Sequence, residues 1–208
     1  MARSWSLPSN GIGSGSFDLN VAGTDEGTGI AAWTAVAVSA SEVFVAEQVA
    51  GYKLRLLTSE LDGGVDQLTL RAGADGQAIA AWHQKSETAN GIYVSSRSAP
   101  DRWTVPRLET DRLSFGSFAF DPALALGRGG HVVAAWNQQK DNLLVAQVAT
   151  RGPAEDRFHR PSGGDDFLSL PINFVNCPRP AVNSHGDAIV VWSQSDGGEL
   201  RVWVSERE

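Results

Sequence analysis

The stretch GHVVAAW, residues 130–136, decides the fold, because its pattern occurs four times in the chain. In each copy a glycine stands six residues before a tryptophan, and the four residues before the tryptophan are small or β-branched. This pattern indicates a tight turn followed by a buried strand. The other copies are residues 27–33, 76–82 and 186–192.

The tryptophans of these copies are 49, 54 and 56 residues apart along the chain. A repeat of roughly this length is typical of propeller blades. Each repeat divides into short strand-like runs, and no window shows helical periodicity; in the third repeat the runs are 122–126, 132–136, 143–146 and 158–161. The sequence therefore predicts an all-β fold: a four-bladed β-propeller with four antiparallel strands per blade, forming a single domain over residues 1–208. The recurring tryptophans are expected to pack in the core.

The two ends of the chain are predicted to meet in the last blade. The fourth repeat ends at Glu208 without its outer strand, while residues 5–8 (Trp-Ser-Leu-Pro) resemble residues 103–106 (Trp-Thr-Val-Pro). We expect the N-terminal strand to complete the last blade, which would close the ring and remove an open edge. The alternative is two chains joined in one eight-bladed ring; the match between residues 5–8 and 103–106 favours the closed monomer.

The repeat resembles the Gly-x-Ala-x-Ala-x-Trp blades of many bacterial propeller proteins, and the predicted architecture is similar to the four-bladed hemopexin type. The resemblance covers the whole chain and implies the fold. The blade signature of the hemopexin family is not visible, so its disulfide and its haem-binding role are not expected here.

Composition limits the possible functions. The 208 residues carry a formal charge of −7 without a cluster of Lys or Arg, which disfavours nucleic acid as a partner. No apolar run approaches the roughly 18 residues of a membrane span. The first residues lack the apolar core of a signal peptide, so we expect a cytoplasmic protein, or a secreted one if a leader has been removed. Cys177 is the only cysteine, which excludes an internal disulfide and is consistent with a reducing compartment.

Polar residues follow the tryptophans at equivalent positions, on the face where we expect a ligand pocket. These are Gln84, Gln138 and Gln194, with Asn137 beside the second. An amide both donates and accepts hydrogen bonds, so the glutamines could converge on a sugar. Alternatively, each glutamine holds the loop of its own blade.

The loops that lead into the third and fourth blades carry large apolar groups. They include Phe115, Phe118, Phe167 and Phe174. These side chains would either cap the core or form the apolar wall of a ligand pocket.

The third set of candidates lies fifteen residues before each tryptophan: Asp18, Gln67, Asp121 and Cys177. Inner strands around a common axis would bring these groups together. Asp18 and Asp121 could hold a calcium ion or act as an acid and a base; alternatively, they cap strand ends by bonding backbone amides. His83 is the one histidine placed for general-base chemistry, beside Trp82.

The sequence thus favours a ligand-binding propeller with a single axial pocket for a small molecule or a carbohydrate. The first alternative is an enzyme, a hydrolase, lyase or cyclase, that uses His83, Asp121 or Asp18 in the same pocket. The second is a protein-interaction scaffold.

Overall fold

The computed structural model describes residues 16–37, 40–48, 52–58, 63–86, 90–107, 111–116, 118–159, 167–170, 175–195 and 198–207. They form four separate antiparallel sheets, one for each tryptophan repeat. Within these ranges no helix is long and apolar enough to cross a membrane. The predicted all-β propeller with four blades is therefore confirmed.

The first two blades have four strands each. Blade 1 contains β1 (Ser16–Gly23), β2 (Gly29–Ala37), β3 (Ala40–Gln48) and β4 (Tyr52–Leu56). Blade 2 contains β5 (Gly64–Ala72), β6 (Ala78–Lys85), β7 (Gly91–Ala99) and β8 (Arg102–Trp103), with a short 3-10 turn at Ala74–Gly76.

The last two blades have three strands each in the described residues. Blade 3 contains β9 (Ala119–Leu126), β10 (Val132–Lys140) and β11 (Leu143–Arg151). Blade 4 contains β12 (Val175–Val182), β13 (Ala188–Ser195) and β14 (Leu200–Arg207). The fourth strand expected in blade 3, residues 158–161, is described as far as His159, which forms a bridge with Thr150. The predicted closing strand, residues 5–8, lies outside the described residues.

The core lies between the blades. In each gap the tryptophan of one blade packs against the aliphatic side of the blade before it, because alternate residues of a strand point to opposite faces. Trp82 packs with Val43 and Val45, and Trp136 with Ile79 and Ile92. Trp192 completes the series against Val133 and Ala135. The prediction that these tryptophans serve the core is confirmed.

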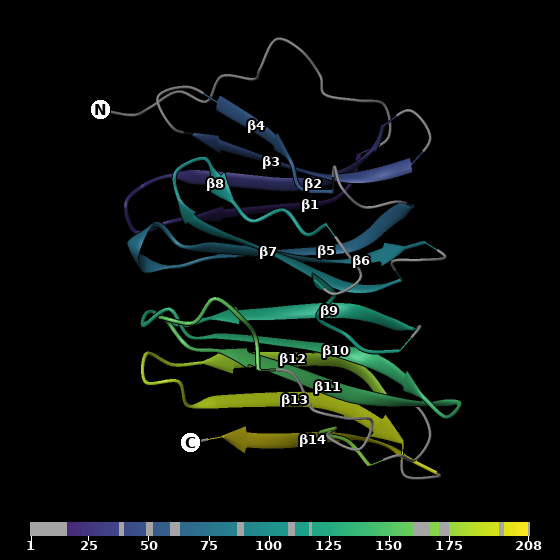
Figure 1. The fold of residues 1–208 in the computed structure, drawn as a ribbon. Helices are drawn as coiled ribbons and strands as arrows, with labels where there is room; N and C mark the ends of the chain where they lie inside the picture. The colour runs from purple at the N-terminus through teal and green to yellow at the C-terminus, as the bar shows by residue number, and fades with distance from the viewer. Residues whose placement is uncertain are drawn as a thin grey trace.

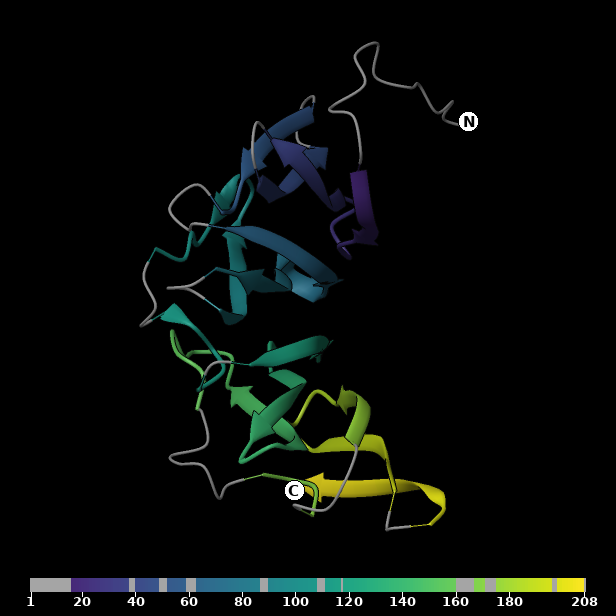
Figure 2. The ribbon, with the colours of Figure 1, turned by 90° about the vertical axis from the view of Figure 1, so that its right-hand side faces the viewer.

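The described blades form a row that bends into an arc (Figures 1 and 2). The inner strand β1 packs on β5, β5 on β9, and β9 on β12. Blade 1 and blade 4 lie at opposite ends of this row. The closed ring expected from the sequence is thus not formed by the described residues, which present two free ends.

Candidate functional site

The inner edge of the arc carries the row of residues that the sequence singled out. Asp18, Gln67, Asp121 and Cys177 have φ values of 51°, 57°, 53° and 52°, the left-handed conformation that L-residues seldom adopt. In each blade the strand register shifts at this residue, so it forms a β-bulge. The bulge explains why the same position recurs at the inner edge of all four blades.

Three residues of this row, Asp18, Gln67 and Asp121, bind one another from blade to blade. The Asp18 carboxylate accepts from the backbone N–H of Gln67 at 2.7 Å. The Gln67 side chain in turn accepts from the backbone N–H of Asp121 at 2.8 Å and donates to its Oδ1 at 2.9 Å. Asn137 donates to the second oxygen of Asp121 at 3.2 Å. These bonds tie blade 1 to blade 2 and blade 2 to blade 3. The Asp18 carboxylate binds backbone amides, as the capping alternative expects, whereas the Asp121 carboxylate binds side-chain amides.

This arrangement does not suit the predicted calcium ion. Calcium takes about six to eight oxygen ligands. Here the carboxylate of Asp18 is bound to backbone amides and that of Asp121 to two side-chain amides, with Gln67 between them. Among the described residues no three His, Cys, Asp or Glu side chains gather as a metal site would require.

His83 lies inside blade 2 and is 3% exposed. Its Nδ1 is 2.9 Å from Asp66 Oδ1, and its Nε2 is 3.2 Å from Asn90 Oδ1. Partial burial raises the pKa of Asp66, but the hydrogen bonds and charges of His83 and Lys85 outweigh it and hold that pKa below its ordinary value. Both ring nitrogens are thus engaged within the blade, so the structure does not present His83 to a substrate as a general base.

The three glutamines lie inside their blades and are fully buried. In each, the side-chain oxygen accepts from the indole N–H of the tryptophan two residues earlier, at 3.0–3.3 Å. The side-chain nitrogen donates to a loop carbonyl: Gly63 from Gln84, Phe118 from Gln138 and Leu170 from Gln194. Their amides join a core tryptophan to a loop and do not line a pocket, which corrects the ligand-binding assignment.

The phenylalanine loops are anchored to the sheets. Leu113 and Leu168 donate backbone N–H groups to the third strands of their preceding blades. Phe115 is half-buried, and Phe167 lies under the Lys140 ammonium group, 5.0 Å from its ring centre. Phe118 is exposed, with its ring 5.3 Å from that of Phe120. Phe174 lies outside the described residues.

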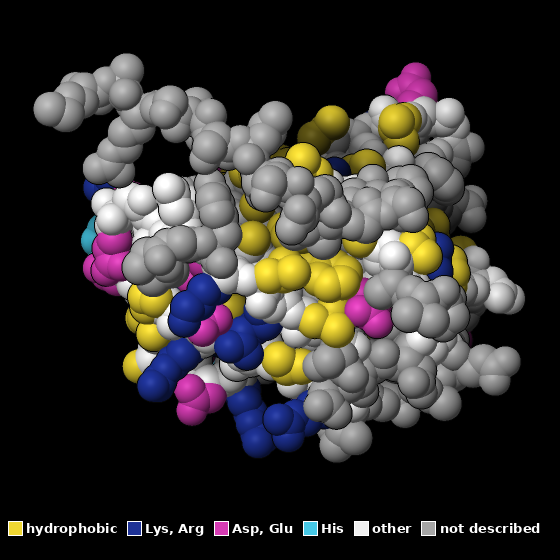
Figure 3. Space-filling view, turned by 90° about the horizontal axis from the view of Figure 1, so that it is seen from above, with side chains coloured by type: hydrophobic (Ala, Val, Ile, Leu, Met, Phe, Trp, Pro, Cys, Tyr) yellow, Lys and Arg dark blue, Asp and Glu magenta, His cyan; other side chains and the backbone are white. Residues whose placement is uncertain are grey.

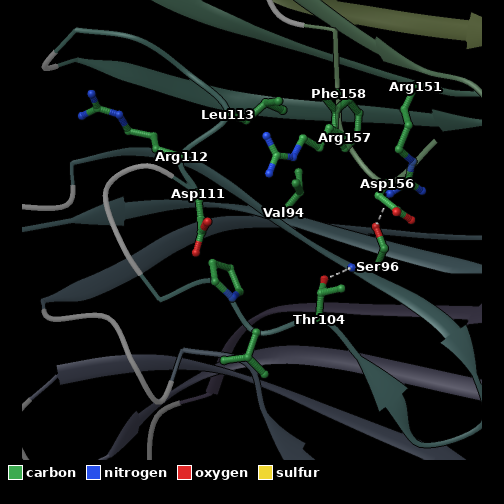
Figure 4. A pocket seen from close by; sticks show the side chains of 12 residues that line it. Val94, Ser96, Thr104, Asp111, Arg112, Leu113, Arg151, Asp156, Arg157 and Phe158 are labelled. Carbon is green, nitrogen blue, oxygen red and sulfur yellow. Dashed lines mark hydrogen bonds between the residues drawn. The ribbon is translucent and has the colours of Figure 1, made fainter.

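A cavity of about 430 Å³ opens between blades 2 and 3, away from the inner row (Figure 4). Strand β7 contributes Val94 and Ser96, and the segment after β8 contributes Thr104, Val105 and Pro106. Blade 3 contributes Arg151 and the segment that follows β11. The remaining lining residues are Asp111, Arg112, Leu113, Asp156, Arg157 and Phe158.

The cavity combines an apolar wall with polar groups of both signs. In Figure 4 the Arg157 guanidinium group points into its centre, with Asp111 and Asp156 to either side, whereas Arg112 runs away from it. Arg112 instead donates to the Asn90 carbonyl at 2.8 Å.

Arg151 forms the floor of the cavity. It donates to Ser96 Oγ at 2.8 Å and lies over the Phe158 ring, 5.1 Å from its centre. Burial lowers the pKa of Arg151, and the charges of Asp156 and Glu155 offset this in part. The floor is thus a fixed cation stacked on an aromatic ring.

The cavity exists because the repeats differ at equivalent positions. In the first gap the corresponding space is filled by Glu47, which binds Arg97 and Trp103. In the second gap Ser96 replaces the glutamate, and Phe158 precedes His159, which is bridged to Thr150. A shorter side chain leaves the space open. When the blades are aligned on their tryptophans, Ser96 occupies the position equivalent to Glu47. This difference is the sequence signal that could have indicated the cavity.

Comparison with known proteins supports the class of fold. No model of a known protein family matches the chain, and no curated protein matches it. A solved structure of a protein of unknown function from Dyadobacter fermentans is similar, with a TM-score of 0.58 at 12% identity over 91% of this chain and 64% of that one. A GH93 α-L-arabinofuranosidase of Fusarium graminearum, solved with arabinobiose, is similar with a TM-score of 0.52 at 11% identity, over 91% and 61% of the two chains.

The fold defines this chain as a β-propeller protein, as the repeats predicted. The chain spans less than two thirds of the length of these two structures. The finer likeness to hemopexin-type propellers stays a prediction.

Proposed function

We propose that this chain is a carbohydrate-binding β-propeller and that its ligand occupies the cavity between blades 2 and 3. The observation that carries the proposal is the composition of this cavity: an aromatic ring under a fixed arginine, with a second arginine, two hydroxyl groups and two carboxylates around it. A sugar presents an apolar C–H face and several hydroxyl groups that both donate and accept hydrogen bonds. Such a cavity offers partners for both.

The dimensions of the cavity support a ligand of this kind. Small-molecule sites occupy about 300–1,000 Å³ and contain a few well-placed polar groups, and this cavity of about 430 Å³ falls in that range. The arabinobiose in the similar GH93 structure is in accord with a sugar ligand, although the likeness itself concerns the fold alone.

Titration calorimetry against a panel of neutral and acidic mono- and disaccharides tests the proposal. We expect at least one sugar to bind, and Arg157→Ala and Phe158→Ala each to weaken its binding by about tenfold or more, since a lost stacking or charged contact is worth over 1 kcal/mol. Arg128→Ala, on the exposed turn after β9, is the matched control and should bind normally. Equal affinity in the Arg157 and Phe158 variants would place the ligand elsewhere, and no binding to any sugar would refute the proposal.

One observation favours a second candidate, a glycoside hydrolase. Asp111 and Asp156 lie on either side of the cavity, and a pair of carboxylates across a glycosidic bond is the machinery of such enzymes (Figure 4). Release of reducing sugar from a bound oligosaccharide, lost in Asp111→Asn while affinity is kept, would identify the enzyme. If the unaltered protein binds a sugar without any turnover, the hydrolase is excluded and the carbohydrate-binding function stands.

A further inference from the structure

Every blade has two unlike faces, and the described gaps use them in the same way. One face carries the tryptophan, and the opposite face carries β-branched residues and alanines. In the first gap the tryptophan face of blade 2, with Leu68 and Leu70, covers the aliphatic face of blade 1, with Ile30 and Val43. The second and third gaps repeat this pairing.

Among the described residues, no blade lies in front of the tryptophan face of blade 1. Leu19 and Val21 stand 14 and 12 residues before Trp33, as Leu68 and Leu70 stand before Trp82. Leu68 and Leu70 are 7% and 2% exposed, whereas Leu19 and Val21 are 73% and 76% exposed. Figure 3 looks down on this end of the molecule and shows hydrophobic side chains gathered near its centre. Large exposed apolar groups at core positions mark an interaction surface.

The aliphatic face of blade 4 is exposed at the other end of the row. Val202 stands ten residues after Trp192, as Val43 stands after Trp33, and Ile189 corresponds to Ile30. Val43 and Ile30 are 0% and 2% exposed, whereas Val202 and Ile189 are 76% and 37% exposed. Each end therefore presents the half of a blade interface that the other end lacks.

A series of polar contacts between neighbouring blades gives a second, independent indication of the partner that each end of the row lacks. In each described gap an arginine of the following blade donates to a side chain of the preceding one. The pairs are Arg97 to Glu47 at 2.9 Å, Arg151 to Ser96 at 2.8 Å and Arg207 to Thr150 at 2.6 Å.

The ends of the row carry the next acceptor and the missing donor of this series. Glu206 pairs with Ile189 as Glu47 pairs with Ile30, so Glu206 is the fourth acceptor, and it is exposed. The donor arginine directly follows the acceptor position of its own blade, as Arg97 follows Ser96. In blade 1 this donor position is occupied by Gln48, which is also exposed. A side-chain amide donates to a carboxylate, so the two ends are complementary in polar as well as apolar groups.

We propose that two copies of this chain associate head to tail through these faces, blade 4 of each on blade 1 of the other, and close an eight-bladed ring. The two faces of one chain lie at opposite ends of the row and do not meet. A second copy covers both at once, because a head-to-tail contact that closes forms a ring. Two copies of four blades give eight, within the four to eight blades of known propellers, and a third copy would exceed that range.

Sedimentation velocity of the whole chain over a wide concentration range tests the proposal. We expect twice the mass of one chain. Gln48→Glu sets a carboxylate against Glu206, so it should raise the dissociation constant by at least about tenfold, since facing like charges are strongly unfavourable. Adding Glu206→Arg to the same chain should restore an opposite-charge pair and return the constant to near its original value. Both residues are exposed, so these variants should fold.

Val202→Lys tests the apolar contact and should likewise raise the dissociation constant, whereas Arg128→Glu, on the turn after β9, should stay dimeric. Circular dichroism of each variant confirms that the blades have folded. An unaltered chain that remains monomeric at about 100 µM would overturn the proposal. So would a dimer that neither Gln48→Glu nor Val202→Lys weakens.

Discussion

At the scale of the residue, the repeats let one position be compared in different settings. Eleven residues after the tryptophan, blades 1 and 2 have Phe44 and Tyr93, whose rings stack on Trp33 and Trp82 at 6.0 and 6.4 Å. Blade 3 has Gln147, which is fully buried and whose two polar side-chain atoms have no hydrogen-bond partner within the described structure. Gln138, in the same blade, is equally buried but hydrogen-bonds through both its side-chain oxygen and its side-chain nitrogen.

Three glutamines of blade 3 give a matched prediction. Gln138→Met should lower the free energy of unfolding by about 1–3 kcal/mol, because the buried Trp136 indole N–H loses its acceptor and the Phe118 carbonyl keeps only the backbone N–H of Gln139. Gln147→Met should raise it by about 1 kcal/mol or more, because an unpaired buried amide is removed at nearly constant volume. Gln139→Met, at an exposed position, should change it by less than about 0.5 kcal/mol. Urea unfolding of the three variants measures all of these, and a destabilised Gln147→Met would contradict the account.

The Glu47–Arg97 pair predicts how stability depends on pH. Burial raises the pKa of Glu47, but hydrogen bonds from Arg97, the Asp101 amide and Trp103 together lower it by more, so its pKa lies below the ordinary 4.5. A carboxyl group whose pKa is lowered by folding stabilises above its ordinary pKa, and this contribution is lost as the pH falls through the lowered value.

Glu47→Gln should therefore cost about 3 kcal/mol near pH 7, as expected for a buried pair with one partner removed. The variant should lose less stability than the unaltered chain between about pH 5 and about pH 2. Thermal melts across this range measure both effects. Glu199→Gln, at an exposed position, should follow the unaltered chain, and an unchanged acid dependence in Glu47→Gln would show that other carboxyl groups control it.

At the scale of the element, the turn before each tryptophan strand is the most regular feature of the chain. Gly27, Gly76, Gly130 and Gly186 all have positive φ, at 80°, 69°, 84° and 98°. Only glycine adopts this conformation without strain. The turn that the sequence predicted is thus confirmed in all four blades.

Substitution of one of these glycines by alanine should lower the free energy of unfolding, and by more where the added Cβ meets nearby atoms. A Cβ at Gly130 would stand 3.1 Å from Pro153 Cβ, whereas a Cβ at Gly27 meets nothing within 4 Å. Gly27→Ala should therefore cost about 1 kcal/mol, the strain alone, and Gly130→Ala more than that. Gly29→Ala, where φ is not positive and the nearest atom is 3.5 Å away, should be neutral. Equal melting temperatures for the Gly27, Gly130 and Gly29 variants would contradict this ordering.

The strands were predictable because their pattern is local, whereas the site depends on contacts between blades. Periodicity placed every inner, second and third strand, and the fifteen-residue spacing identified the inner row of Asp18, Gln67 and Asp121. Spacing could not reveal that the Gln84 side chain bonds to its own Trp82. A glutamine at this position is compatible both with a side chain that lines a pocket and with one that is buried within its blade. The cavity arises from the difference between Ser96 and Glu47 in neighbouring gaps, which periodicity averages away.

At the scale of the whole molecule, each blade, in its described residues, contacts only its neighbours in the row. Stability in such a row is set by neighbouring interfaces, and the end blades have one interface where the inner blades have two. The proposed partner copy would supply the missing contacts at both ends.

Association of this kind predicts a melting temperature that depends on concentration. Binding to the folded state alone raises stability by mass action, so a rise from about 1 to about 100 µM should increase the melting temperature by a few degrees. Differential scanning calorimetry of the unaltered chain and of Gln48→Glu measures this. The variant should melt at a temperature that varies little with concentration, and a constant melting temperature in both would count against the ring.

The repeated pairing of a tryptophan face with an aliphatic face also bears on how a gene of this kind can lengthen. An in-frame tandem duplication of one repeat would insert a unit whose front already fits its predecessor and whose back already fits its successor. The longer product would need no compensating mutation at the new junction. The pairing rule therefore orders the units without itself setting their number, which is limited instead by how many blades a closed ring can hold.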